Sequence, residues 1–174
     1  MIYQRNSIFV VDTNVGMVAN GKSDMSQQCK FECSRRLSEI MKTHCVAIDS
    51  KWLILKEYNS CLKTSGEPGI GDMYLKWIFT NYTNPEKCSL VEIKPTDKSC
   101  LDFVELAGIT ALSDFDPSDK KFIAVAIAHP KKPSIVEASD SKWIRLRGKL
   151  DSFGVSIIFP CEEELEVIHE HKCH

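Results

Sequence analysis

The chain has 174 residues, of which 43% are hydrophobic and 26% charged, and its 22 basic and 24 acidic residues leave a net charge of −2. This length favours one domain with its own hydrophobic core, and the ordinary composition disfavours disorder, collagen and coiled coil. The near-neutral charge argues against a large basic surface for nucleic acid but does not exclude an enzyme that acts on one. No apolar run approaches the roughly 20 residues of a membrane span, so no membrane partner is expected.

Cysteine is the unusual part of the composition, with eight residues. Residues 1–6 lack the basic and apolar regions of a signal peptide, and no Cys-x-x-Cys pair indicates a zinc ribbon or thioredoxin motif. These features predict reduced thiols that act as small hydrophobes in a cytoplasmic protein. Cys29 and Cys33 share one helix face, which permits a metal or redox pair, although buried thiols are the favoured interpretation. The C-terminal group of His169, His171, Cys173 and His174 is expected to be a frayed polar tail rather than a metal site.

Short apolar segments alternate with segments of helical periodicity along the whole chain. In chain order, the pattern predicts a strand at 7–11, a helix at 23–43, a strand at 45–48, a helix at 50–63, a loop at 64–71, a helix at 72–82, a strand at 89–93, helices at 97–108 and 116–128, a strand at 133–138, a helix at 141–153, a strand at 155–159 and a helix at 162–169. Ser50 and Asp116 are the predicted helix caps.

Strands separated by helices imply right-handed crossovers, a mainly parallel central sheet and helices on both of its faces. The predicted fold class is therefore a three-layer α/β/α domain. We expect one domain over residues 1–174, with a core at about 7–160 and a C-terminal helix and tail at 161–174.

Acidic residues follow the strands at the edge where ligands bind in such sheets. Asp12 follows the first strand and Asp140 follows the fourth. Glu57 lies about two turns into the helix after the second strand, and Asp119 lies in the first turn of the helix that leads to the fourth strand. Each acid alone has a bland interpretation, as a helix cap or a solvated side chain. Together they predict a convergent carboxylate cluster, which needs a counterion because like charges repel. Carboxylate ligands without clustered His or Cys favour Mg²⁺ or Mn²⁺.

The order of these motifs resembles the PIN-domain ribonucleases. The resemblance rests on Asp12-Thr13-Asn14 after a strand, Glu57 on a helix, Asp119 at a helix start and Ser139-Asp140 after a later strand, and it covers about residues 7 to 160. Many members of the family have Thr-Asn-Asp where this chain has Ala138-Ser139-Asp140.

The resemblance implies metal-dependent hydrolysis of phosphodiester bonds in mostly single-stranded RNA. Asp12, Glu57, Asp119 and Asp140 would bind one or two Mg²⁺ or Mn²⁺ ions, which would activate water and stabilise charge on the phosphate. Asn14, Thr13 and Ser139 would orient these ligands. The roles it suggests are the toxin of a toxin–antitoxin pair, a defence nuclease or an RNA-processing nuclease, with a cognate antitoxin, another protein or a second copy as further partners.

A basic stretch surrounds Asp140, in which Lys142, Arg145 and Arg147 are candidate RNA contacts. A solvated helix face explains these cations nearly as well, and Trp143 is expected to belong to the core.

Three other functions are compatible with parts of the pattern. A haloacid dehalogenase-type phosphatase needs a second acid two residues after Asp12, where this chain has Asn14. A receiver-type domain needs paired acids at the same place. A PIN-like module that binds RNA or protein without catalysis remains the main alternative, and the set of four acids argues against it.

Overall fold

The computed structural model describes residues 6–64, 68–113 and 115–172. The predicted fold class is confirmed: five parallel strands form one sheet in the order β3-β2-β1-β4-β5. The strands are β1 (Ile8–Val11), β2 (Cys45–Asp49), β3 (Cys88–Val91), β4 (Ser134–Val136) and β5 (Ile157–Ile158).

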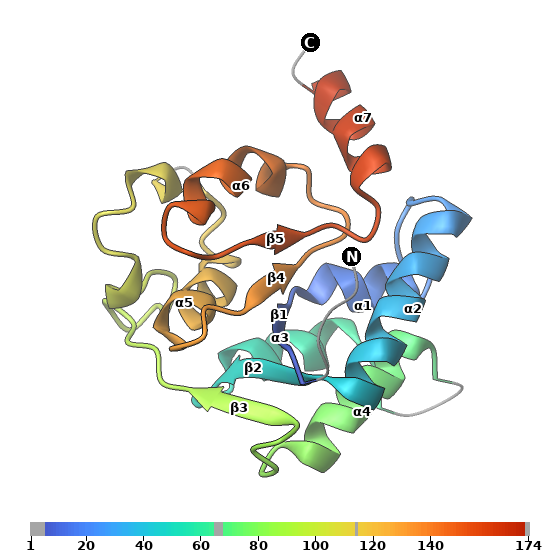
Figure 1. Cartoon of the computed structure of the whole chain (residues 1–174), viewed down its shortest axis with the longest axis horizontal. Coiled ribbons are helices and arrows are strands. Elements are labelled where there is room, and N and C mark those ends of the chain that lie inside the picture. Colours follow the sequence, from blue (N-terminus) through green and yellow to red (C-terminus); the bar gives the residue numbers. More distant parts are fainter. Residues whose placement is uncertain (1–5, 65–67, 114, 173–174) are drawn as a thin grey trace.

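The helices occupy both faces of the sheet. They are α1 (Thr13–Ala19), α2 (Gln27–Thr43), α3 (Leu53–Cys61), α4 (Ile70–Asn81), α5 (Lys120–Ala128), α6 (Lys142–Asp151) and α7 (Glu162–Lys172), with 3₁₀ turns at η1 (Val104–Leu106) and η2 (Thr110–Leu112). Figure 1 shows α1, α2 and α4 gathered on one side of the sheet and α5 on the other. This division follows from right-handed crossovers, because the chain runs from β1 towards β3 and then returns past β1 to β4 and β5.

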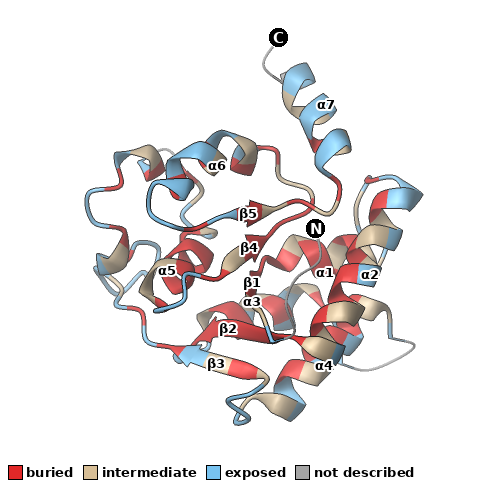
Figure 2. Cartoon of the chain, viewed as in Figure 1, coloured by how far each residue is buried: buried red, intermediate tan, exposed pale blue. Residues whose placement is uncertain are grey.

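The core lies between these layers, and the central strands are buried on both faces (Figure 2). All five residues of β2 are buried, as expected for a parallel strand covered by helices on both sides. The helix α7 projects from the body of the molecule at the end of the chain (Figure 1). Among the described residues, no helix combines the length and apolarity that a membrane span requires.

Several predicted boundaries are wrong, each for a local reason. The predicted helix at 23–43 begins at Gln27 because Ser26 caps it, and a separate helix, α1, starts directly after Asp12. Ser50 does not cap α3. The buried carboxylate of Asp49 accepts the backbone N–H groups of Lys51, Leu53 and Ile54 instead, at 2.8 to 3.0 Å.

The predicted helix at 97–108 is also wrong. Only the 3₁₀ turn η1 forms there, because Pro95 and Phe103 pair as an antiparallel bridge that holds the preceding segment in a loop. Asp116 does not cap α5 directly. Its carboxylate accepts the N–H of Ser118 at 3.0 Å, and the helix begins after Asp119.

The prediction that all thiols are reduced is wrong as well. Cys29, on the first turn of α2, and Cys161, just before α7, form a disulfide across 132 residues of sequence. Sequence spacing alone does not reveal such a distant pair. The thiol of Cys33, one helical turn after Cys29, is fully buried 3.9 Å from the Cys161 sulfur. Cys33, Cys45, Cys61, Cys88 and Cys100 are free.

Candidate active site

The candidate site lies between β1 and β4, where the order of the strands reverses. Strands after β1 are added on one side of it, and β4 and β5 are added on the other. Parallel sheets bind ligands at the carboxyl ends of the strands beside such a switch point. The register pairs Val11 with Val136, so the next residues of the two strands, Asp12 and Glu137, emerge beside each other.

Glu137 is fully buried at this edge. One carboxylate oxygen, Oε1, accepts the backbone N–H groups of Ser139 and Asp140, both at 2.8 Å, and the side-chain amide of Asn14 at 3.3 Å. The other oxygen, Oε2, is buried without a hydrogen-bond partner. Burial raises the pKa of Glu137 to about 7, against the lowering effect of these donors.

Asp12 follows β1, as Glu137 follows β4, and it is buried and caps α1. Its Oδ1 accepts the N–H of Asn14 at 2.8 Å, and its Oδ2, like Oε2 of Glu137, is buried without a partner. Burial raises the pKa of Asp12 well above its usual value, and the carboxylates of Glu137, Asp119 and Glu57 raise it further. Two neighbouring acids therefore each present one oxygen that the protein leaves unsatisfied.

Glu57 reaches the site from α3, but its carboxylate is already occupied. Thr13 donates its hydroxyl to Oε1 at 2.5 Å, and the ammonium of Lys121 on α5 forms an ion pair with Oε2. Lys121 is buried, and it also donates to the carbonyl of Ser118 and lies over the ring of Phe122. A cation supplied by the protein thus neutralises Glu57.

Asp119 and Asp140 stand at the rim of the site. Burial raises the pKa of Asp119 to about 6, and the charges of Asp116 and Asp140 add to the shift while Lys121 opposes it. Asp140 is half-buried, and its Oδ1 accepts the N–H of Lys142 at 3.0 Å.

The electrostatic interactions connect Asp12 with Glu57, Asp119 and Glu137, and Asp119 with Asp140. The acids nevertheless do not form a tight metal cage. Over the described residues, no three carboxylates bring one oxygen each within 4.8 Å of one another, and the group that meets this test consists of cysteines. The pair with unpartnered oxygens, Asp12 and Glu137, is the part of the site that fits a hard cation.

The three residues predicted to orient the ligands, Thr13, Asn14 and Ser139, lie around these acids. Asn14 and Thr13 hold Glu137 and Glu57, respectively. Ser139 contacts Glu137 through its backbone N–H rather than its hydroxyl.

The basic residues of α6 divide into two groups. Lys142 and Arg145 are exposed and line a pocket of about 170 Å³ with Lys149 and Phe115, whereas Arg147 pairs with Glu162 at 2.6 Å and stacks on Phe159. Trp143 is fully buried against Phe115, as expected for a core residue.

Sequence reasoning missed two residues of the site, Glu137 and Lys121. Glu137 was assigned to the predicted strand 133–138, where an acid in an apolar run was itself the available signal, because a buried strand carries a charge only at a cost. Lys121 gave no such signal, since a lysine in the first turn of a helix is ordinarily solvated.

The chain was compared with protein-family models, with curated proteins and with solved structures, and none of them matches it.

Proposed function

We propose that the chain is an Mg²⁺- or Mn²⁺-dependent endoribonuclease that hydrolyses phosphodiester bonds of single-stranded RNA in the cytoplasm. The observation that carries this proposal is the pair of buried carboxylate oxygens, Oδ2 of Asp12 and Oε2 of Glu137, that have no partner at the switch point of the sheet. Without a cation, one of two adjacent buried carboxyl groups retains its proton, because ionisation of both would place two like charges side by side away from water.

The residues that would hold the ion are Asp12 and Glu137, with Asp119 and Asp140 at the rim. Their oxygens suit a hard divalent cation, which supplies an activated water and stabilises charge on the attacked phosphate. The raised pKa values of Asp12, Glu137 and Asp119 indicate that the site favours added positive charge.

The protein's own side chains would position the ligands and the substrate. Asn14 and the N–H groups after Glu137 hold Oε1 of that acid and leave Oε2 without a partner, so that Oε2 would be available to an ion. Lys142 and Arg145, on the first turn of α6 shortly after Asp140, would contact the phosphates of an RNA strand that crosses this edge.

A second candidate function is a PIN-like module that binds RNA without cleaving it. The observation in its favour is Glu57, whose two oxygens are taken by Thr13 and Lys121 and so are not available to an ion. Both candidates bind RNA. They differ in whether the site can bind the metal ion and cleave RNA when Glu57 is not a ligand.

The test is cleavage of mixed single-stranded RNA by the native chain with Mg²⁺, with Mn²⁺ and with a chelator. We expect cleavage only with metal, and a loss of at least 100-fold in the variants Asp12→Asn and Glu137→Gln. Arg147→Gln is the matched control, because Arg147 in the middle of α6 forms an ion pair with Glu162 at the start of α7.

RNA binding measured on the same preparations separates the two candidates. Binding without cleavage under every metal condition, with no heat of Mn²⁺ binding by calorimetry, would support the non-catalytic module. Cleavage that persists in both acid variants would show that the site is elsewhere.

A further inference from the structure

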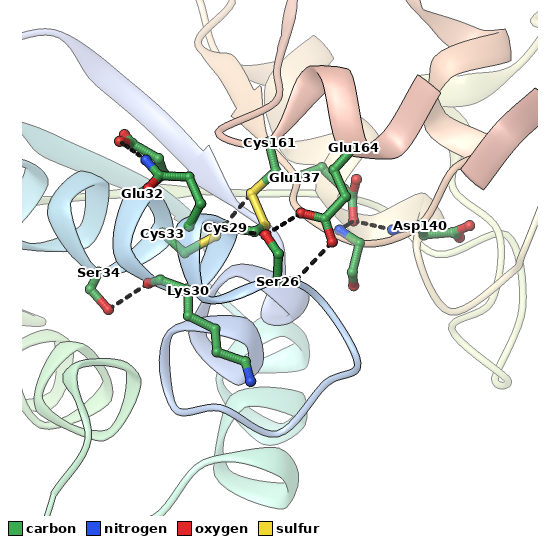
Figure 3. The surroundings of a disulfide bond; sticks show 12 residues. Ser26, Cys29, Lys30, Glu32, Cys33, Ser34, Glu137, Asp140, Cys161 and Glu164 are labelled. Carbon is green, nitrogen blue, oxygen red and sulfur yellow. Dashed lines mark hydrogen bonds between the residues drawn. A yellow bond between two sulfur atoms is a disulfide. The ribbon is translucent and has the colours of Figure 1, made fainter. Parts of the chain in front are cut away.

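Three sulfur atoms meet at a second place in the molecule, where the start of α2 approaches the start of α7. Cys29 and Cys33 lie four residues apart on one face of α2, and Cys161 immediately precedes α7. The three sulfurs all lie within 4.8 Å of one another, and all three residues are buried (Figure 3). Two of them form the disulfide, and the third, Cys33, is 3.9 Å from Cys161.

The disulfide alone does not account for this arrangement, because it uses two cysteines and leaves a third at the same point. We propose that, when the disulfide is reduced, Cys29, Cys33 and Cys161 form a binding site for a thiophilic divalent cation such as Zn²⁺. Tetrahedral zinc thiolates have Zn–S bonds of about 2.3 Å, which separate neighbouring sulfurs by about 3.8 Å. The separation between Cys33 and Cys161 already matches this value.

The surroundings also favour a cation. The carboxylates of Glu137, Glu32 and Glu164 interact electrostatically with Cys33, and Glu32 and Glu164 also border the pocket beside Cys29 and Cys161. Glu164 accepts the N–H and the hydroxyl of Ser26, one turn before Cys29, at 2.8 and 2.6 Å, so the acidic side of the site is held in place (Figure 3).

An entry path is present. A pocket of about 420 Å³ opens beside Cys29 and Cys161 and is bordered by acidic side chains. A cation would enter through this pocket, and three sulfur ligands would leave its fourth position to water or to an outside ligand.

The two forms of the site interconvert by thiol chemistry with a small dithiol as the reductant. The dithiol loses two electrons and two protons and becomes a disulfide, while the bond between Cys29 and Cys161 breaks and each sulfur gains a proton. Binding of the cation then releases the protons of the coordinating thiols to solvent.

The experiment uses the full chain, reduced with a phosphine and freed of metal, titrated with Co²⁺ as a spectroscopic probe. Before the titration, the free thiols of the reduced chain are counted without denaturant and then in denaturant, which shows whether the disulfide has been reduced in the folded chain. We expect intense sulfur-to-cobalt charge-transfer absorption that saturates at one ion per chain and disappears on addition of one equivalent of Zn²⁺. Cys33→Ser should lower this absorption by about a third and weaken Co²⁺ binding at least 10-fold.

Cys88→Ser is the matched control, because Cys88 is a buried free thiol on β3; it should leave the absorption unchanged. Asp12→Asn should also leave it unchanged, which separates this site from the proposed nuclease site. A disulfide that resists reduction in the folded chain would overturn the proposal, as would the absence of charge transfer or an unaltered spectrum in Cys33→Ser. Cys161→Ser provides a second variant if Cys33→Ser does not fold.

Discussion

The side-chain amide of Asn14 donates to Oε1 of Glu137 at 3.3 Å and so joins the segment after β1 to the segment after β4. The contact spans the switch point of the sheet and leaves Oε2 of Glu137 as the acceptor without a partner. A conservative change at Glu137 therefore tests the electrostatics of the site while it retains the oxygen that Asn14 contacts.

Glu137→Gln should flatten the pH dependence of stability in metal-free protein. The folded pKa is raised from 4.5 to about 7, so the folded state binds more protons than the unfolded state between these values. The stabilisation from this group is complete below pH 4.5, decreases as the pH rises from 4.5 to 7 and is lost above 7, and it amounts to about 3 kcal/mol. Urea unfolding from pH 4 to 8 measures this slope.

At pH 8 without divalent ions, Glu137→Gln should therefore be more stable than the native chain. Addition of Mn²⁺ should raise the melting temperature of the native chain and have little effect on the variant. The control is Glu92→Gln, an exposed acid that follows β3. Equal pH slopes in the native chain and in Glu137→Gln would contradict the buried ionisation.

The fold was predictable because its elements depend on local patterns. Apolar runs rich in β-branched residues marked all five strands, and the order of strands and helices indicated the parallel sheet. The acids Asp12 and Asp140 could be placed at one edge for the same reason, since strand ends in a parallel sheet share that edge.

What could not be predicted depends on contacts between distant segments. The ion pair of Lys121 with Glu57 joins α5 to α3, and the disulfide joins residues 132 positions apart. Neither leaves a periodic signal in the sequence. The predicted helix at 97–108 is wrong because a tertiary contact overrides the local pattern. The apolar residues there have helical spacing, but the bridge between Pro95 and Phe103 holds the segment between them in a loop.

Lys121→Met should expose the role of the ion pair with Glu57. The variant keeps the length of the side chain but leaves Glu57 without its cation, so the free energy of unfolding should fall by about 1–3 kcal/mol in metal-free buffer. The freed carboxylate would then be available to an added cation. We expect Mn²⁺ to raise the melting temperature more in Lys121→Met than in the native chain.

The neighbouring Lys120→Met is the control for this prediction, because Lys120 pairs at 3.6 Å with the exposed Asp102, which does not belong to the site. Its response to Mn²⁺ should equal that of the native chain. An unchanged response in Lys121→Met would show that Glu57 takes no part in cation binding.

Reduction of the disulfide between Cys29 and Cys161 should destabilise the metal-free chain. The bond closes a loop of 132 residues, for which the chain-entropy model gives about 5 kcal/mol, and measured losses are typically 2–4 kcal/mol. Urea unfolding with a chelator, with and without a phosphine reductant, measures the difference. The double variant Cys29→Ser, Cys161→Ser should have the same free energy of unfolding as the reduced native chain, and the reductant should not change it. A native chain that is equally stable in both buffers would show that the bond does not constrain the unfolded state.

Gly71→Ala should disturb the site from a distance through the contact between α4 and α1. A Cβ at Gly71 would lie 2.2 Å from the carbonyl oxygen of Gly16 and 2.9 Å from its Cα, and backbone atoms cannot yield as a flexible side chain does. We expect a loss of about 3 kcal/mol in the free energy of unfolding.

The same change should weaken Mn²⁺ binding and RNA cleavage, because α1 begins with Thr13 and Asn14, which hold Glu57 and Glu137. Gly148→Ala is the matched control: a Cβ at this position of α6 meets no atom within 4 Å, and the better helix propensity of alanine should stabilise the chain by about 0.5–1 kcal/mol. Denaturant unfolding and Mn²⁺ calorimetry on both variants separate close packing from a general effect of glycine replacement. If Gly71→Ala is as stable as the native chain and binds Mn²⁺ as tightly, the approach of the two helices does not position the carboxylates.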